Sequence, residues 1–459
     1  MHFNSALFHR PTLLELLRLS LPMVVSQGAF AVMIFTDRYF MSQIDPLHMA
    51  AAMGGGVASF FSMSLFLGLL AYSNALVAQY FGAGEKDKCA RVVSQGVIIA
   101  VACMPVLLLI AYFVADLFSA MGHQSEQVKL EKIYYQLLVY GSFLPLSKVC
   151  LASYFSGIGN TRIVMICDVL GMMLNIPLSY ILIFGKFGLP ELGIVGAAWG
   201  TIFSSCFALL LFLFFYLRSS NRLEFSIADS FRFDRGIMKR FIRLGLPSGL
   251  EMFLNVAAFN LFLLMFQSYG IPQAAAATIV FNWDILAFVP MLGLNIGVIS
   301  LVGRFVGANN MQRTNQVIAS AFLVALAYTG ALALLFVFFR VPLVKVFVQP
   351  GGDGDLIIEL ASFMMLGLAT YVMADGLRIV ASGVLRGAGD TRWLMRYSAL
   401  LNWLMLLAQY FIIRVLHADP RASWILFVIM IIALTCLCLW RLFGGKWRDP
   451  QILQSVMIE

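Results

Sequence analysis

The stretch GLPSGLEMFLNVAAFNLFLLMF, from Gly245 to Phe266, contains a single charged residue, Glu251, and the next charged side chain in the chain is Asp284. An apolar run of about 20 residues is long enough to cross the hydrocarbon core of a bilayer as a helix. The whole chain has this character, because its 459 residues are 61% hydrophobic and only 12% charged. Soluble domains carry about 25% charged residues. We therefore predict an all-α integral membrane protein.

Apolar runs of this length recur along the chain and predict twelve transmembrane helices, six in each half. They lie near residues 16–40, 50–80, 92–115, 133–156, 163–184, 192–217, 244–269, 274–302, 317–339, 357–385, 393–414 and 423–442. If the termini and every second loop share one side, that side holds about two-thirds of the lysines and arginines, and the positive-inside rule makes it the cytoplasmic side. We expect a multi-pass protein with both termini in the cytoplasm.

The two halves of the chain repeat each other. RLSLP (Arg18–Pro22) recurs as RLGLP (Arg243–Pro247), and GIGNTR (Gly157–Arg162) recurs as GAGDTR (Gly387–Arg392). Because each half has an even number of predicted spans, the two copies have the same orientation and are related by a pseudo-two-fold axis along the membrane normal. Transporters built from such parallel repeats bind their substrates near the interface between the repeats. A transporter is therefore the leading interpretation.

The repeat also predicts the domain organisation. We expect an N-terminal six-helix lobe over residues 1–217 and a C-terminal six-helix lobe over residues 244–459, which ends in a short cytoplasmic tail. The longest polar connection, residues 218–243, is rich in arginine and is the predicted cytoplasmic loop between the lobes.

Three long motifs resemble those of a known family. They are FTDRYFMSQI (Phe35–Ile44), NIPLSYILIFGKFGLPELGIVGAAWGT (Asn175–Thr201) and YVMADGLRIVASGVLRGAGDTR (Tyr371–Arg392). The sequence is similar to the multidrug and toxic compound extrusion (MATE) transporters, in particular their NorM-like bacterial branch. The resemblance implies a V-shaped bundle of two lobes in the bacterial inner membrane. It also implies export of organic cations and drugs in exchange for Na⁺ or H⁺.

The family's cation-coupling residues can be placed in the N-terminal lobe. The resemblance places them at Asp37, Asn175 and Thr201, with Ser179 at a position where another branch has an aspartate.

In the C-terminal lobe the resemblance implies a cation site at Tyr371 and Asp375, which are one helical turn apart on one face. The family's acidic residue in the seventh span falls at Asn255. Glu251 lies one turn earlier on the same face, so we expect Glu251, Asn255, Tyr371 and Asp375 to form the second site. No metal is expected apart from Na⁺ at these coupling residues.

Charged side chains inside the predicted spans are candidates without reference to any family. A charge at the centre of a spanning helix costs about 2.5–3.5 kcal/mol on insertion scales, so it usually faces a cavity or a partner. The candidates are Asp37, Lys148, Asp168, Glu251, Asp284, Asp375 and Arg378.

These candidates differ in whether the sequence places a residue of opposite charge on the same helix face. Arg378 follows Asp375 by three residues and can pair with it, whereas Glu251 has no basic residue on its own helix face and suits a carboxyl that loads and releases protons. Lys148 has no acidic residue three or four positions away, and a pair between Lys148 and Asp168 is our hypothesis.

Partners of the protein follow from its composition. Methionine and aromatic rings suit flat organic cations, because methionine repacks and aromatic faces attract cations; Trp199, Asn282 and Trp283 are possible liners of a substrate cavity. No phosphate-binding loop for ATP is present, so the expected energy source is an ion gradient, without any cofactor. We expect a monomer in a lipid bilayer that binds small molecules and no nucleic acid.

Three alternatives stay open at this stage. A flippase for lipid-linked precursors shares the superfamily plan, but it predicts two further spans and a basic cavity. A membrane-embedded enzyme needs clustered histidines or a nucleophile with its base, and the five histidines are dispersed. A non-transporting scaffold has no use for costly intramembrane carboxylates.

Overall fold

The computed structural model describes residues 9–120, 124–348, 351, 353–449 and 453, and the regular structure in these ranges is helical. In the first half the helices are α1 (Arg10–Ser42), α2 (Pro46–Ala71), α3 (Ser73–Gly82), α4 (Lys86–Ala120), α5 (Ser125–Tyr140), α6 (Phe143–Gly157), α7 (Thr161–Phe184), α8 (Gly193–Tyr216), α9 (Ser219–Glu224) and η1 (Ile227–Asp229). In the second half they are α10 (Arg235–Gln267), α11 (Ile271–Gly307), α12 (Met311–Lys345), α13 (Asp353–Ala388), α14 (Thr391–Tyr410), η2 (Phe411–Val415), α15 (Pro420–Phe443) and η3 (Lys446–Arg448).

The predicted spans are confirmed within the described residues. Eleven helical segments are long and apolar enough to cross a membrane, and the pair α5–α6, bent by 45°, supplies the twelfth. Several helices extend beyond their predicted spans, since α5 begins at Ser125 and not near residue 133, and α10 begins at Arg235 and not near residue 244. The predicted loop 218–243 is therefore partly helical, since it also contains α9 and η1.

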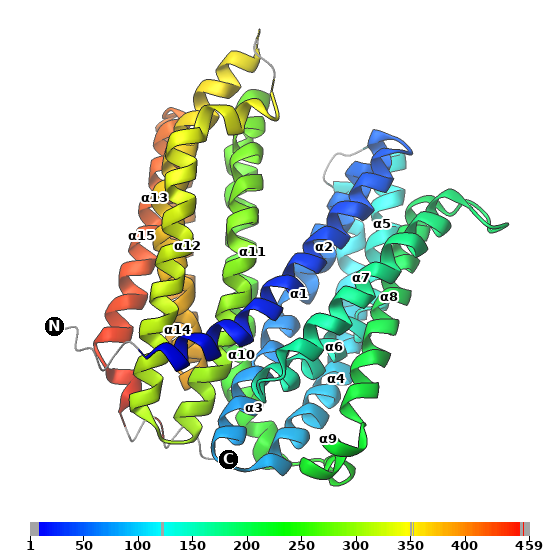
Figure 1. Ribbon diagram of the computed structural model, residues 1–459. Coiled ribbons are helices and arrows are strands. Elements are labelled where there is room, and N and C mark those ends of the chain that lie inside the picture. Colours follow the sequence, from blue (N-terminus) through cyan, green and yellow to red (C-terminus); the bar gives the residue numbers. More distant parts are fainter. Residues whose placement is uncertain (1–8, 121–123, 349–350, 352, 450–452, 454–459) are drawn as a thin grey trace.

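The spans form two bundles that diverge from a common narrow end. Figure 1 shows α12, α13 and α15 in one bundle and α5, α7 and α8 in the other, with α3 and α9 at the narrow end. The end of α1 and the start of α2 lie at the wide end, as do the end of α12 and the start of α13. The predicted V shape is therefore present.

The first helix of each lobe begins inside the other lobe. Leu16 and Leu19 of α1 belong to an apolar cluster built mainly from α11, α12 and α13. In the same way, Phe241 and Leu244 of α10 belong to the large apolar cluster of the N-terminal lobe. The division predicted from sequence, with lobes at 1–217 and 244–459, misses this exchange. Burial of these side chains stabilises the narrow end.

A close backbone approach marks the pseudo-two-fold axis at the narrow end. A Cβ on Gly82 would overlap the carbonyl of Arg304, and a Cβ on Gly307 would overlap the carbonyl of Gln79. The two contacts are copies, because Gly82 and Gln79 are each 225 positions before Gly307 and Arg304. Only glycine allows α3 and α11 to cross at this distance.

We expect the substitution G82A to destabilise the protein by about 1–3 kcal/mol, because the added methyl group has to displace backbone atoms of α11. Thermal unfolding of the purified protein measures the loss, and spin-label distances across the wide end measure any change in lobe separation. G330A is the matched control, since a Cβ on Gly330 meets nothing within 4 Å. Equal stability of the two variants would contradict a close-packed crossing.

Candidate cation sites in the two lobes

A carboxylate inside the N-terminal lobe is surrounded by hydroxyl groups. Asp37 lies on α1 with only 7% of its surface exposed. The Thr201 hydroxyl on α8 donates a hydrogen bond to Asp37 Oδ2 over 3.2 Å, and the Ser179 hydroxyl on α7 faces the same carboxylate. Asp37 forms no ion pair within the described part of the chain.

The close packing of α7 and α8 explains why these groups meet. A Cβ on Gly200 would lie 3.0 Å from the Cα of Ser179, so glycine lets α8 approach α7 at this level. The next residue, Thr201, then reaches Asp37. Small residues at helix contacts are typical of membrane proteins, where close backbone approach replaces the hydrophobic effect as the packing force.

Asn175 completes the group one turn before Ser179 on α7. Its side-chain nitrogen donates to Ser204 Oγ over 3.3 Å, and Ser204 Oγ donates in turn to the Thr201 carbonyl over 3.0 Å. The structure therefore brings Ser179 and Thr201 to Asp37 and connects Asn175 to Thr201 through Ser204, and the cation-binding role of these four residues stays a prediction.

Three oxygen atoms of this group lack a hydrogen-bond partner among the described residues. They are Asp37 Oδ1, Asn175 Oδ1 and Ser179 Oγ, and all three are buried. Unsatisfied buried polar atoms are rare in folded proteins and call for an explanation. A carboxylate, an amide oxygen and hydroxyls suit a hard cation such as Na⁺ or a proton shared between oxygens. No cluster of His, Cys, Asp and Glu that fits a transition metal occurs in the described ranges.

The hypothesised pair in the same lobe is confirmed. Lys148 Nζ on α6 lies 2.9 Å from Asp168 Oδ1 on α7. The Ser26 hydroxyl on α1 donates to the other oxygen of Asp168. Three helices are joined by this network, and the charge of Asp168 is compensated.

In the C-terminal lobe, Asp375 and Arg378 pair on α13 as the spacing predicts. The Arg378 side chain donates two hydrogen bonds to Asp375 Oδ1, over 2.7 Å from Nε and 2.5 Å from Nη2. Tyr371 lies one turn before Asp375 and is buried.

Asp284 of α11 belongs to this site, which sequence reasoning did not find. Its carboxylate lies beside the Tyr371 hydroxyl and close to Asp375. Asp284 itself forms no ion pair within the described ranges. The cost of a charge inside a span had marked Asp284 as a candidate, but no sequence spacing links α11 to α13.

The predicted role of Glu251 as an unpaired carboxyl is wrong. Glu251 is 2% exposed, and Arg386 of α13 donates to its Oε1 over 3.0 Å. Glu251 Oε2 has no partner among the described residues. Its helix carries no nearby basic residue, as the sequence shows, but the partner comes from another helix 135 positions away.

Asn255 also lies apart from the predicted group. Its side-chain oxygen accepts hydrogen bonds from Asn402 over 2.8 Å and from Ser398 over 3.1 Å, both on α14. The four residues expected to form one C-terminal site are thus divided: Tyr371 and Asp375 with Asp284, Glu251 with Arg386, and Asn255 with α14.

The three possible cavity liners differ in their surroundings. Trp283 donates to the Leu343 carbonyl of α12 over 3.3 Å, so it packs within its own lobe and is not a free liner. Trp199 is 38% exposed and stacks on Phe203 of the same helix, and Asn282 is exposed.

Charge compensation separates the interior carboxylates into two kinds. Asp168, Asp375 and Glu251 each have a basic partner. Among the candidates inside the spans, Asp37 and Asp284 form no ion pair within the described residues, so each lobe contributes one candidate carboxylate without an ion-pair partner. These two residues are the strongest candidates for reversible cation binding, because an unpaired carboxylate in an apolar medium gains most from a bound cation.

A duplicated helical membrane bundle with uncompensated carboxylates in both lobes has the architecture of a secondary transporter. The sequence profile of the MatE family matches the chain twice, over residues 22–181 and 247–411. The two matches begin at Pro22 and Pro247, in agreement with the internal repeat. The chain belongs to the MATE family, whose members are transporters and not enzymes.

Curated relatives cover almost the whole chain. The "Probable multidrug resistance protein NorM" of Pasteurella multocida is 29% identical over 395 residues, which span 85% of this chain and 84% of that protein. The "Multidrug resistance protein MdtK" of Yersinia enterocolitica is 27% identical over 447 residues, covering 95% and 96% of the two chains.

Solved structures share the fold. One, described as the "outward-facing conformation of a multidrug resistance MATE family transporter of the MOP superfamily", superposes with a TM-score of 0.85 at 21% identity and covers 97% of this chain and 99% of that one. A MOP superfamily transporter from Pyrococcus furiosus gives 0.84 at 21% identity, with coverage of 100% and 99%.

We expect K148M and D168N each to destabilise the protein, because each leaves one charge inside the lobe without its partner. Breaking a fully buried pair costs about 3–5 kcal/mol, and we expect about 1–3 kcal/mol here since both side chains are partly exposed. The charge-swapped variant K148D/D168K should recover most of the loss in thermal unfolding. Single variants as stable as the wild type would show that the pair is dispensable.

Proposed function

We propose that this protein is a secondary multidrug antiporter that exports organic cations in exchange for Na⁺ or H⁺. The observation that carries the proposal is the buried group of unsatisfied oxygens around Asp37. The printed names of the NorM and MdtK relatives, which are multidrug resistance proteins, support the choice of drugs as substrates.

The N-terminal site can take either coupling ion. A Na⁺ ion would be coordinated by Asp37 Oδ1 and by the free oxygens of Asn175 and Ser179. A proton on Asp37 Oδ1 would instead donate to one of these two oxygens. Both events neutralise Asp37 and satisfy buried acceptors, so both weaken the attraction of the lobe for an organic cation. Exchange follows from this difference in affinity between the two occupied states.

The C-terminal site provides a second unpaired carboxylate, Asp284. Arg378 holds Asp375 in a two-point hydrogen bond, which leaves Asp284 beside Tyr371 as the group free to bind and release a cation. The interior of the protein has more acidic than basic residues. This balance favours an organic cation over the pyrophosphate of a lipid-linked precursor.

The V-shaped arrangement of the two lobes supports the assignment of this structure to an outward-facing state. The narrow end of the V is formed by α3, α9 and the arginine-rich connection between the lobes, which the positive-inside rule assigns to the cytoplasm. The wide end then opens to the outside, and inward opening requires separation of the lobes at the narrow end.

An ion gradient supplies adequate energy. One charge that crosses 100 mV releases about 2.3 kcal/mol, which supports close to a 50-fold concentration gradient of a neutral solute. For a monovalent organic cation exchanged one-for-one with the coupling ion the potential term cancels, and the concentration gradient of the coupling ion supplies the energy.

We expect D37N and D284N each to reduce ion-driven export of a cationic dye, measured as its accumulation inside everted vesicles, by at least about 100-fold, as removal of one stabilising group from a preorganised electrostatic site does. D116N is the control, because Asp116 is an exposed carboxylate paired with Lys132 away from both sites. Imposed Na⁺ and pH gradients are applied separately, so the experiment also identifies the coupling ion. Full efflux by D37N, or no efflux by the wild type under either gradient, would refute the proposal.

A binding measurement tests the N-terminal site without transport. If Na⁺ is the ion, 100-fold more Na⁺ than its Kd should stabilise the protein by about 2.7 kcal/mol relative to K⁺. The increase in Tm should disappear in N175L and D37N. If the Tm responds to pH and not to Na⁺, and D37N removes that response, the proton is the coupling ion. A Tm that responds to neither, or responds equally in D37N, would exclude Asp37 as the ion site.

A further inference from the structure

A pocket between α10 and α14 lies outside both carboxylate sites. It is an open depression of about 250 Å³ near the narrow end, where α14 begins. Its lining is Ile242, Arg243, Leu246, Pro247, Leu250, Arg392, Met395 and Arg396. None of the eight lining residues is acidic.

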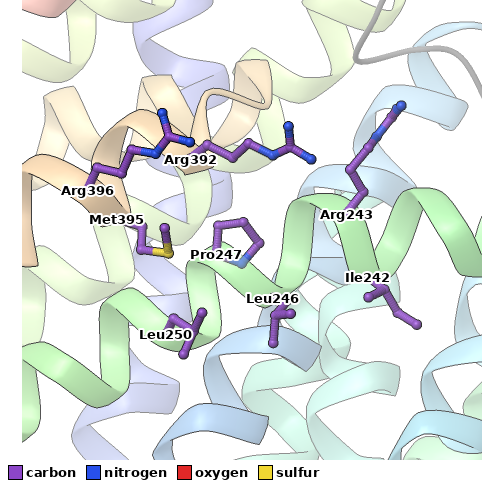
Figure 2. A pocket seen from close by; sticks show the side chains of 8 residues that line it. All are labelled: Ile242, Arg243, Leu246, Pro247, Leu250, Arg392, Met395 and Arg396. Atoms are coloured by element: carbon purple, nitrogen blue, oxygen red, sulfur yellow. The ribbon is translucent and has the colours of Figure 1, made fainter.

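The lining is divided into a basic and an apolar side. Figure 2 shows the long side chains of Arg392 and Arg396 extending from α14 above Pro247, while Leu246 and Leu250 of α10 lie below. Leu246 is 38% exposed, so the apolar side is open to the surroundings of the protein and is not a closed core. A guanidinium group binds phosphate through two parallel hydrogen bonds.

The two arginines of α14 are available for a ligand. Arg392 and Arg396 are both exposed, and neither forms an ion pair or a hydrogen bond with the described residues. They are one turn apart on the same helix face. Repulsion between them is relieved when an anion binds between them.

The internal repeat shows that the second arginine of this pocket is specific to the second lobe. The equivalent positions in the first lobe keep an arginine at 162 and a methionine at 165, but Ile166 stands where the second lobe has Arg396. The backbone plan is shared, whereas the second basic residue of the helix is not. A packing role alone would not require an arginine at this place.

We propose that the pocket binds an anionic phospholipid. The phosphate of the head group lies between Arg392 and Arg396, and an acyl chain runs along Ile242, Leu246 and Leu250. Basic pockets between transmembrane helices at the cytoplasmic side are suited to anionic head groups. The amphipathic lining fits a lipid better than a free phosphate ion, because a free ion gains nothing from the exposed apolar side.

The bound lipid would brace α10 against α14 at a sensitive position. Leu250 precedes Glu251, and Asn255 one turn further is tied to α14 by its hydrogen bonds. Pro247 interrupts the hydrogen bonding of α10 inside the pocket, and a proline is a site of helix bending. A lipid wedged there therefore stabilises one bend of α10.

Native mass spectrometry of the full chain tests the proposal with phosphatidylglycerol, phosphatidylcholine and inorganic phosphate as separate probes. We expect phosphatidylglycerol to bind in preference to the other two, and R392Q/R396Q to bind it about 30-fold more weakly, from about 1 kcal/mol per basic residue. R396I, which restores the first-lobe composition, should lose about fivefold. R162Q and R414Q are controls that should bind as the wild type does.

Several outcomes would overturn the proposal. Unchanged phosphatidylglycerol binding by R392Q/R396Q places the lipid elsewhere, and equal binding of phosphatidylcholine removes the role of the charge. Binding of inorganic phosphate as tight as that of phosphatidylglycerol would identify a phosphate site without a lipid. If the double variant does not fold, R396I decides in its place. None of these measurements depends on transport, so they stand apart from the proposed antiport.

Discussion

The interior of this protein is governed by the cost of a carboxylate in a medium that cannot solvate it. An isolated charge at the centre of a spanning helix costs several times the thermal energy, so it must be paired, protonated or bound to a cation. Three interior carboxylates satisfy this constraint with a basic partner on the same or another helix. Asp37 and Asp284 form no ion pair within the described residues, and a bound cation, as proposed above, would satisfy the constraint there. On that proposal, this difference separates structural carboxylates from coupling carboxylates.

The narrow end limits how the two lobes can move. The starts of α1 and α10 are each buried in the opposite lobe, and the backbones of α3 and α11 touch at Gly82 and Gly307. Polar contacts add to this closure, since Gln79 donates to the Gly387 carbonyl over 2.8 Å and accepts from Arg240 over 2.5 Å. Inward opening therefore has to break a packed interface. Neutralisation of a carboxylate is a local event, and only a shift between two discrete packings can convert it into this large motion.

The spans and the repeat could be predicted because their signals are local in the sequence, whereas the N-terminal group of Asp37, Asn175, Ser179 and Thr201 came only from the family resemblance. Apolar length identifies a span, and the pair of Lys148 and Asp168 follows from the rule that interior charges need partners. The C-terminal site could not be predicted in the same way. Arg386 falls one residue beyond the predicted span 357–385, where it resembles an ordinary loop cation, yet the structure turns it toward Glu251. The approach of Asp284 to Tyr371 depends on the rotation of two long helices, which no spacing within either helix records.

The repeat explains which interior charges are structural. Lys148 and Arg378 occupy equivalent positions in the two lobes, 230 residues apart, so both copies keep a cation at this point of the fold. Their partners differ, because Lys148 binds Asp168 from α7 whereas Arg378 binds Asp375 on its own helix. Because both lobes keep a cation here while its partner differs, we attribute the cation to a packing requirement at this position.

The two carboxylates without an ion pair are not repeated between the lobes. The positions equivalent to Asp37 and Asp284 are Phe262 and Ser59. The two carboxylates are therefore not related by the repeat, and the two proposed cation sites need not bind their ion in the same way.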